Sequence, residues 1–246
     1  MRKIFLVQLC LVLCGVSGHA VPQSARDLRV SAIQYNQKLP LVEALRVIGM
    51  HIQGGFVSFG VDISGVSEPR VDVTTPETDL VDALQRITSQ LPGYTSEFVS
   101  DHVVEVYSAK DRVDPENPLN LPIRQFSVVG VPASQILSVP TRYIPELKDY
   151  LSKHHSPLGC GSIGPGLGSD ALGVTLFLTG RSVRQILDAV AEADAVLPLP
   201  TANSKRVRLN PVGWVHVRKN DTKLGIVDVW SSTWFAPLNW RLYASR

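Results

Sequence analysis

Paired cysteines, a dominant charge and a second long apolar run are all missing from this chain of 246 residues. Two of its three cysteines, Cys10 and Cys14, lie in the apolar amino-terminal segment, and only Cys160 lies in the rest. A chain that loses this segment cannot form an internal disulfide, so a disulfide-stapled scaffold is excluded. No C-x-x-C or H-x-x-x-H spacing is present either. We therefore expect neither a bound metal nor another cofactor.

The first 20 residues have the three parts of a secretory signal peptide. A positive start, "MRK", precedes the apolar run "IFLVQLCLVLCGV" and the small residues of "SGHA". The apolar run has about 13 residues, fewer than a bilayer span needs, and no later segment approaches that length. Cys14 follows Leu13 rather than a small residue, which disfavours a lipid anchor. We expect cleavage near Ala20, a periplasmic or secreted protein, and no transmembrane segment after cleavage.

The charges of the chain nearly balance, with 24 lysines and arginines against 22 aspartates and glutamates. Arg2 and Lys3 belong to the predicted signal peptide, so the mature chain carries equal numbers of both signs. A neutral protein lacks the attraction that draws basic proteins to nucleic acid or to anionic membranes. We therefore expect no nucleic-acid partner.

The first patterned block spans residues 28–108. Apolar residues at helical spacing predict a helix in "PLVEALRVIGMHIQ", with Pro40 at its first position. "FVSFGVD" and "RVDVTT" predict strands, and Thr75 with Pro76 predicts the start of a second helix. "GYTSEFVSDHVVEVYS" predicts a hairpin that turns near Ser100 and Asp101. The block therefore has the order of two β-α-β units.

A proline-rich, charged stretch at residues 109–122 predicts a linker to a second domain at residues 123–246. In that domain "IRQFSVVGV", "GVTLFLTG" and "GWVHVRKN" predict strands, and "SVRQILDAVAEA" predicts a helix. The two halves share the order strand, helix, strand, which indicates an internal duplication. We predict an α+β fold of two small β-α-β-repeat domains, with mixed sheets of short strands packed on helices.

The first block resembles the short N-terminal domain shared by secretins and TonB-dependent transporters. The resemblance lies in "LVEALRVIGMHIQGGFVSFGVD" and "VDVTTPETDLVDALQRITSQLPGYTSEFVSDHVVEVY", where Ala44-Leu45 and Ala83-Leu84 stand at the centres of two helices. It covers residues 28–108, with a looser second copy. It implies a periplasmic module of the cell envelope that binds other proteins or its own copies and has no catalytic residues. The family's module usually precedes a barrel or a channel, which we do not expect here.

A glycine-rich stretch, "GCGSIGPGLG", contains the G-x-G-x-x-G pattern at residues 159–164. A dinucleotide site needs a strand directly before this pattern and a helix that opens inside it. Here a helical segment broken by Pro157 precedes it, and Pro165 with further glycines follows it. We expect a loop and not a nucleotide site.

Three further kinds of catalytic site are considered. His154 and His155 stand close to Cys160 in the sequence, so a thiol-dependent enzyme or hydrolase there is the alternative function. No G-x-S-x-G pattern centres on Ser162 or Ser169. The acidic residues Glu77, Asp79 and Asp82 are typical of a solvated helix face.

The carboxyl-terminal segment holds three of the four tryptophans of the chain. It predicts a final strand that covers a core, but tryptophan and tyrosine also dominate binding surfaces, and aromatic faces stack on sugars. Glycan binding through this segment is therefore a further alternative. The candidate partner-binding residues are Trp230, Trp234, Phe235, Trp240 and Tyr243.

These observations predict a protein that is not an enzyme. We expect an exported protein-interaction or assembly module, associated with the cell envelope, which pairs strand edges and makes apolar contacts with an envelope protein or with itself.

Overall fold

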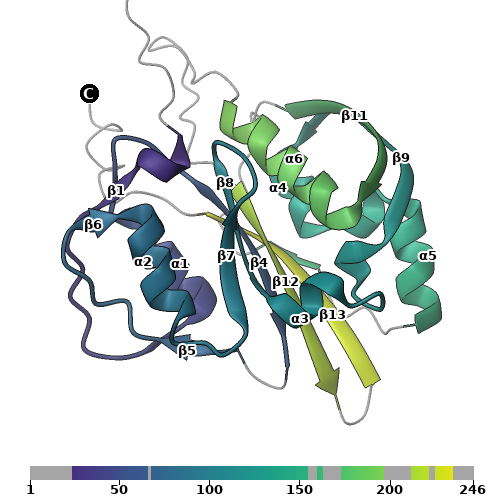
Figure 1. Cartoon of the computed structure of the whole chain (residues 1–246). Coiled ribbons are helices and arrows are strands. Elements are labelled where there is room, and N and C mark those ends of the chain that lie inside the picture. The colour runs from purple at the N-terminus through teal and green to yellow at the C-terminus, as the bar shows by residue number, and fades with distance from the viewer. Residues whose placement is uncertain are drawn as a thin grey trace, which may run out of the picture.

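The computed structural model describes residues 24–65, 68–154, 160–162, 173–196, 212–221 and 225–234 (Figure 1). The predicted signal peptide and its cleavage site lie outside these residues. No helix in the described ranges is long and apolar enough to cross a membrane.

Six strands form the largest sheet. Across the sheet they are β10 (Cys160–Ser162), β13 (Gly225–Trp234), β12 (Val212–Asp221), β4 (Ser58–Ser64), β8 (Val103–Ser108) and β7 (Tyr94–Phe98). The three central strands β12, β4 and β8 run parallel, and hairpins add β13 and β7 antiparallel on either side. The β7–β8 hairpin confirms the predicted turn between them.

Two helices, α1 (Leu41–Met50) and α2 (Leu80–Thr88), cover one face of this sheet (Figure 1). Short strands enclose them from outside: β1 (Arg29–Val30) between β3 (Ile52–Gln53) and β6 (Thr78–Asp79), and β2 (Leu39–Pro40) with β5 (Arg70–Val71). A 3-10 turn, η1 (Ala25–Asp27), begins the described chain. The helices and the sheet share one apolar core, which includes Leu45, Leu84, Phe59, Val61 and Val104.

The opposite face carries a second layer of helices and a long two-stranded sheet (Figure 1). Its elements are β9 (Pro122–Pro132), α4 (Ala133–Ser138), η3 (Pro140–Arg142), α5 (Pro145–His154), β11 (Gly173–Ser182) and α6 (Val183–Val196). Strands β9 and β11 pair antiparallel, and the apolar side chains of α4, α5 and α6 form a core with them. Helices and mixed sheets together confirm the predicted α+β class.

The predicted division into two domains takes a different form in the structure. Strand β12 comes from the second half of the chain and pairs with β4 of the first half, so the two halves share one sheet. The predicted linker forms α3 (Ala109–Val113) and η2 (Pro118–Asn120), and it buries Asp111, Asn117 and Leu119. The charged residues and prolines of this segment form turns and buried contacts. Their pattern in the sequence is the same as that of a linker, so the two cannot be distinguished from the sequence alone.

The predicted starts of α1 and α2 lie one and four residues early. Helix α1 begins at Leu41, with Pro40 as the residue before it. Helix α2 begins at Leu80, because Thr75 is held in a bridge to Ile33 and the next residues pair with β1. In the glycine-rich stretch, Cys160–Ser162 form β10, and residues 163–172 lie outside the described residues.

Candidate functional site

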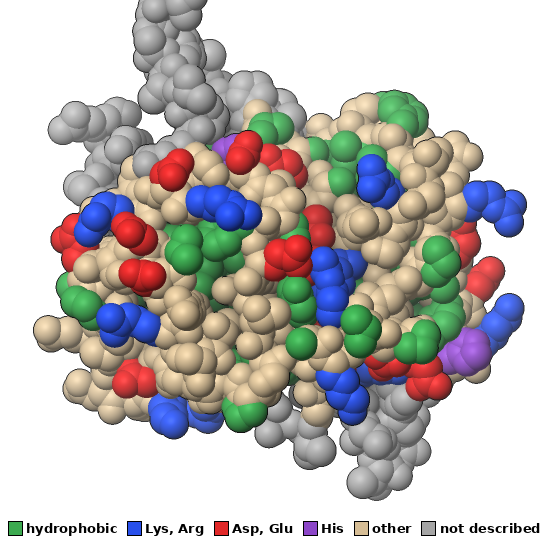
Figure 2. All heavy atoms as spheres, viewed as in Figure 1, with side chains coloured by type: hydrophobic (Ala, Val, Ile, Leu, Met, Phe, Trp, Pro, Cys, Tyr) green, Lys and Arg blue, Asp and Glu red, His purple; other side chains and the backbone are tan. Residues whose placement is uncertain are grey.

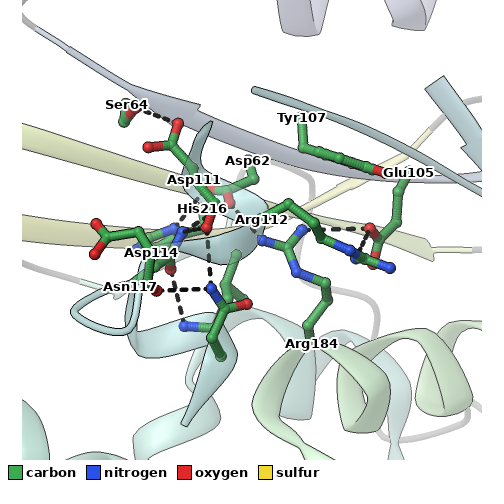
Figure 3. Close-up of polar contacts among 12 residues, drawn as sticks. Asp62, Ser64, Glu105, Tyr107, Asp111, Arg112, Asp114, Asn117, Arg184 and His216 are labelled. Carbon is green, nitrogen blue, oxygen red and sulfur yellow. Dashed lines mark hydrogen bonds and ion pairs between the residues drawn. The ribbon is translucent and has the colours of Figure 1, made fainter. Parts of the chain in front are cut away.

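Strand β4 carries two kinds of side chain on its two faces. Phe59, Val61 and Ile63 enter the core with α1 and α2. Asp62 points the other way, toward α6 and the segment after α3 (Figure 3). Because β4 lies in the middle of the sheet and both its faces are covered, Asp62 is fully buried.

The carboxylate of Asp62 is the centre of a buried hydrogen-bond network. Its Oδ1 lies 2.9 Å from Nδ1 of His216, and its Oδ2 accepts bonds from Arg184 Nη2 at 2.6 Å and Asn117 Nδ2 at 3.0 Å. Burial alone disfavours the charged form, but the hydrogen bonds and charges of His216 and Arg184 outweigh it and hold the pKa of Asp62 at about 2. Asp62 is therefore an anion at neutral pH.

His216, on β12, lies between two carboxylates. Its Nε2 is 2.9 Å from Oδ1 of Asp228 on β13, while its Nδ1 faces Asp62. Burial lowers the pKa of His216, but the bonds to Asp228 and Asp62 more than reverse this and raise it above the usual value. Both ring nitrogens are engaged and the ring is fully buried, so neither nitrogen is free to act as a base on a substrate.

Glu105, on β8, continues the network. Its Oε2 accepts a bond from Arg184 Nη1 at 3.3 Å and a second from Arg112 Nη1 (Figure 3). Burial of the carboxyl, together with the charge of Glu105 and a hydrogen bond to it, raises the pKa of Asp188 well above its usual range. The raised pKa favours the neutral form of Asp188, and Glu105 Oε1 is buried without a hydrogen-bond partner among the described residues. Oδ1 of Asp188 also accepts a hydrogen bond of 3.0 Å from the indole Nε1 of Trp214.

Groups of opposite charge lie against one another in this network. The carboxylates of Asp62, Glu105 and Asp228 contact Arg184, Arg112 and His216. A buried charge is tolerated when it is paired and hydrogen-bonded, as the carboxylate of Asp62 is. The network can therefore fix α6, the segment after α3 and β12 against β4, and it leaves no free acid, base or nucleophile at its centre.

A second contact joins α6 to the sheet. Oε2 of Glu192 accepts bonds from Ser100 Oγ at 2.6 Å and the backbone N–H of His102 at 3.1 Å, and its Oε1 lies 2.9 Å from His102 Nδ1. Arg184, Asp188 and Glu192 follow one another at four-residue spacing, so these three polar contacts to the sheet come from one face of α6.

Sequence reasoning missed this network. The sequence predicts strands around Asp62 and His216 but indicates no partner for either residue. The available signal was the four-residue spacing of Arg184, Asp188 and Glu192 on a helix that also carries an apolar stripe.

The predicted partner-binding residues are only partly placed. Trp230 and Trp234 belong to β13, while Phe235, Trp240 and Tyr243 lie outside the described residues. The backbone of Cys160 in β10 pairs with that of Trp230, and nothing is described of either side chain.

The other predicted candidates lie apart from the buried network. The ring of His154 lies 4.7 Å from that of Tyr150, and His155 is outside the described residues. Glu77 and Asp79 form exposed ion pairs with Arg29. Within the described ranges no group of three His, Cys, Asp or Glu residues could hold a metal ion.

An exposed surface of a different kind lies on the β9–β11 sheet. Phe177 of β11 and Val129 of β9 are each 69% exposed, although the neighbouring Val128 and Val174 are buried. In the described part of the chain no strand pairs with the outer edge of β11 or of β9. Among the described residues, this sheet therefore offers edges without a strand partner beside an exposed aromatic ring. On the face drawn in Figure 2, charges of both signs are scattered and form no continuous basic surface.

No family model, no curated protein and no solved structure matches this chain. The resemblance to the short N-terminal domain of secretins and TonB-dependent transporters therefore stays a prediction.

Proposed function

We propose that this protein is an exported, non-enzymatic interaction module that binds an extended strand along the outer edge of β11. The observation that carries the proposal is the open edge of β11, ten residues long, with Phe177 exposed in its middle. Backbone groups along such an edge give affinity to an added strand, and neighbouring side chains give selectivity.

The two edges of the β9–β11 sheet are not equivalent. Strand β9 begins and ends with proline, and it bulges at Gly130, where φ is +64°. Strand β11 has a glycine of positive φ only near its end, at Gly180, where φ is +62°. Proline and bulges are devices that protect edges from pairing. The central segment 174–179 of β11, "VTLFLT", contains no proline and no charge. Such a segment pairs readily with another strand, so we assign binding to β11 rather than β9.

The buried charged network supports this assignment. It fixes α6, which directly follows β11, to the central sheet through Asp62 and Glu105. A rigidly held edge loses little conformational freedom on binding, and this favours affinity. The predicted signal peptide and the predicted family resemblance point to the cell envelope as the place of action.

Site-specific photocrosslinking in cells tests the proposal. A photoreactive amino acid replaces Thr179, an exposed residue of β11, in the protein expressed from its full sequence. The matched control carries the same group at Val113, which is 78% exposed on α3, away from β11. We expect a discrete adduct from position 179 and none from position 113. Absence of an adduct at 179, or equal adducts at both positions, would contradict the proposal.

A further inference from the structure

We infer that the strand added to β11 is β11 of a second copy of this chain, in antiparallel pairing about a two-fold axis at Phe177. This inference rests on the proposed function and names its partner. It starts from the position of Phe177, which stands near the middle of Gly173–Ser182 and is exposed on the outer face.

Two-fold pairing requires a strand to be complementary to its own reverse. With Phe177 opposite Phe177 of the second copy, Thr175 lies opposite Thr179 and Gly173 opposite Arg181. Aromatic pairs and threonine pairs are both favourable directly across an antiparallel ladder. Phe177, Thr175 and Thr179 thus each meet a suitable partner in this register.

The charges of the strand agree with the same register. Arg181 is the only charged residue of β11, and neither β9 nor β11 contains an acidic residue. Pairing centred at Phe177 places the two copies of Arg181 at opposite ends, about eight residues or roughly 27 Å apart along the strand. An added strand of the same sequence therefore meets no repulsion.

The pairing also completes the sheet. Two-stranded sheets are marginal on their own, and three or more strands stabilise one another. Two copies would join as β9-β11-β11-β9, a four-stranded antiparallel sheet. Its two outer edges are the β9 edges, which proline and the Gly130 bulge already protect. The assembly therefore closes at two copies, as a two-fold interface does.

Sedimentation equilibrium over a range of protein concentrations tests the inference. We expect the wild-type protein to form a dimer, Phe177→Lys and Phe177→Glu each to weaken dimerisation at least tenfold, and an equimolar mixture of the two variants to recover it. The recovery is specific to this register, because only a two-fold axis at position 177 places the two new charges opposite each other. Val129→Lys, equally exposed but on β9, is the matched control and should dimerise as the wild type does.

Three results would overturn the inference: a monomeric wild type at all concentrations, a dimer indifferent to Phe177→Lys, or a mixture that stays monomeric. An unchanged circular dichroism spectrum of each variant confirms that it folds, since Phe177 is exposed. A monomeric protein whose β11 crosslinks to a different protein overturns this inference and leaves the proposed function standing. Crosslinked adducts at twice the chain's own mass support both.

Discussion

Strand β4 buries apolar side chains on one face of the central sheet and a carboxylate on the other, where an apolar core that includes Val103 and Trp214 also lies. Along β4, Phe59, Val61 and Ile63 pack into an apolar core with α1 and α2, whereas Asp62 between them joins a charged network under α6. Apolar burial is non-directional and tolerates small shifts, but charged hydrogen bonds hold only in a narrow range of distance and angle. The apolar core with α1 and α2 therefore stabilises the first half of the chain, while the charged network around Asp62 fixes the position of the second half.

The largest effect is expected from removing the centre of the network. Asp62→Ala leaves His216, Arg184 and Asn117 buried without their shared acceptor, and breaking a buried charge pair in this way costs about 3–5 kcal/mol. The neighbouring change Ile63→Val, on the apolar face, should cost only about 0.5–1.5 kcal/mol. Urea unfolding monitored by circular dichroism measures both. Similar losses for the two variants would erase the distinction between the faces.

A steric change sharpens the same comparison. A Cβ at Gly60 would lie 2.6 Å from Cε2 of the buried Trp214, whose indole donates to Asp188. Gly60→Ala therefore forces the indole away, at a cost of about 1–3 kcal/mol. The near-ultraviolet circular dichroism of the folded variant should also change. An unaltered spectrum and an unaltered free energy of unfolding would contradict this prediction, because they would show that the indole accommodates the added methyl group without moving.

The pH dependence of stability should come from the polar face. The lowered pKa of Asp62 stabilises the fold above pH 3.8, and this contribution, about 2 kcal/mol, disappears as the pH falls from 3.8 to about 2. The raised pKa of His216 acts in the opposite sense: its contribution is complete below pH 6.5 and is lost as the pH rises through its folded value. Unfolding free energies measured against pH should fall on both sides. The raised pKa of Asp188 also makes stability fall as the pH rises above 3.8, so His216→Gln should reduce the decrease above pH 6.5 rather than abolish it. A decrease of the same size in His216→Gln would assign it to other groups.

The smallest effect on the free energy of unfolding is expected from Glu192, which contacts the turn between β7 and β8. Glu192→Gln keeps the size of the side chain but turns an amide donor toward Ser100 or His102, which costs about 1 kcal/mol. Hydrogen exchange should show faster opening of the turn between β7 and β8, with the apolar core unaffected. Equally faster hydrogen exchange in α1 and α2 would contradict this prediction, because it would mean that the Glu192 contact also stabilises the apolar core.

Local patterns predicted much of this fold. Apolar spacing located α1, α6 and the β7–β8 hairpin, because each depends on residues close together in the chain. The start of α2 was wrong, since a bridge between Ile33 and Thr75, 42 positions apart, overrides the local preference of Thr75 and Pro76. Tertiary pairing of this kind leaves no trace in a local pattern.

The charged network could not be predicted for the same reason. Asp62 and His216 are 154 positions apart and meet only because β12 pairs parallel with β4. The sequence predicted more of the exposed β11 edge than of the charged network. Strand "GVTLFLTG" was identified, and edge pairing was expected, but nothing in the sequence distinguishes an outer strand from an inner one.

Residue-resolved amide hydrogen exchange of β11 tests the central claim most directly. Measured by NMR on dilute Phe177→Lys, which the account predicts to be monomeric, alternate amides of residues 174–179 should exchange rapidly, while the amides that bond to β9 stay protected. Protection of every amide in this segment of the monomer would contradict the claim, because it would show that the edge of β11 is already paired within its own chain.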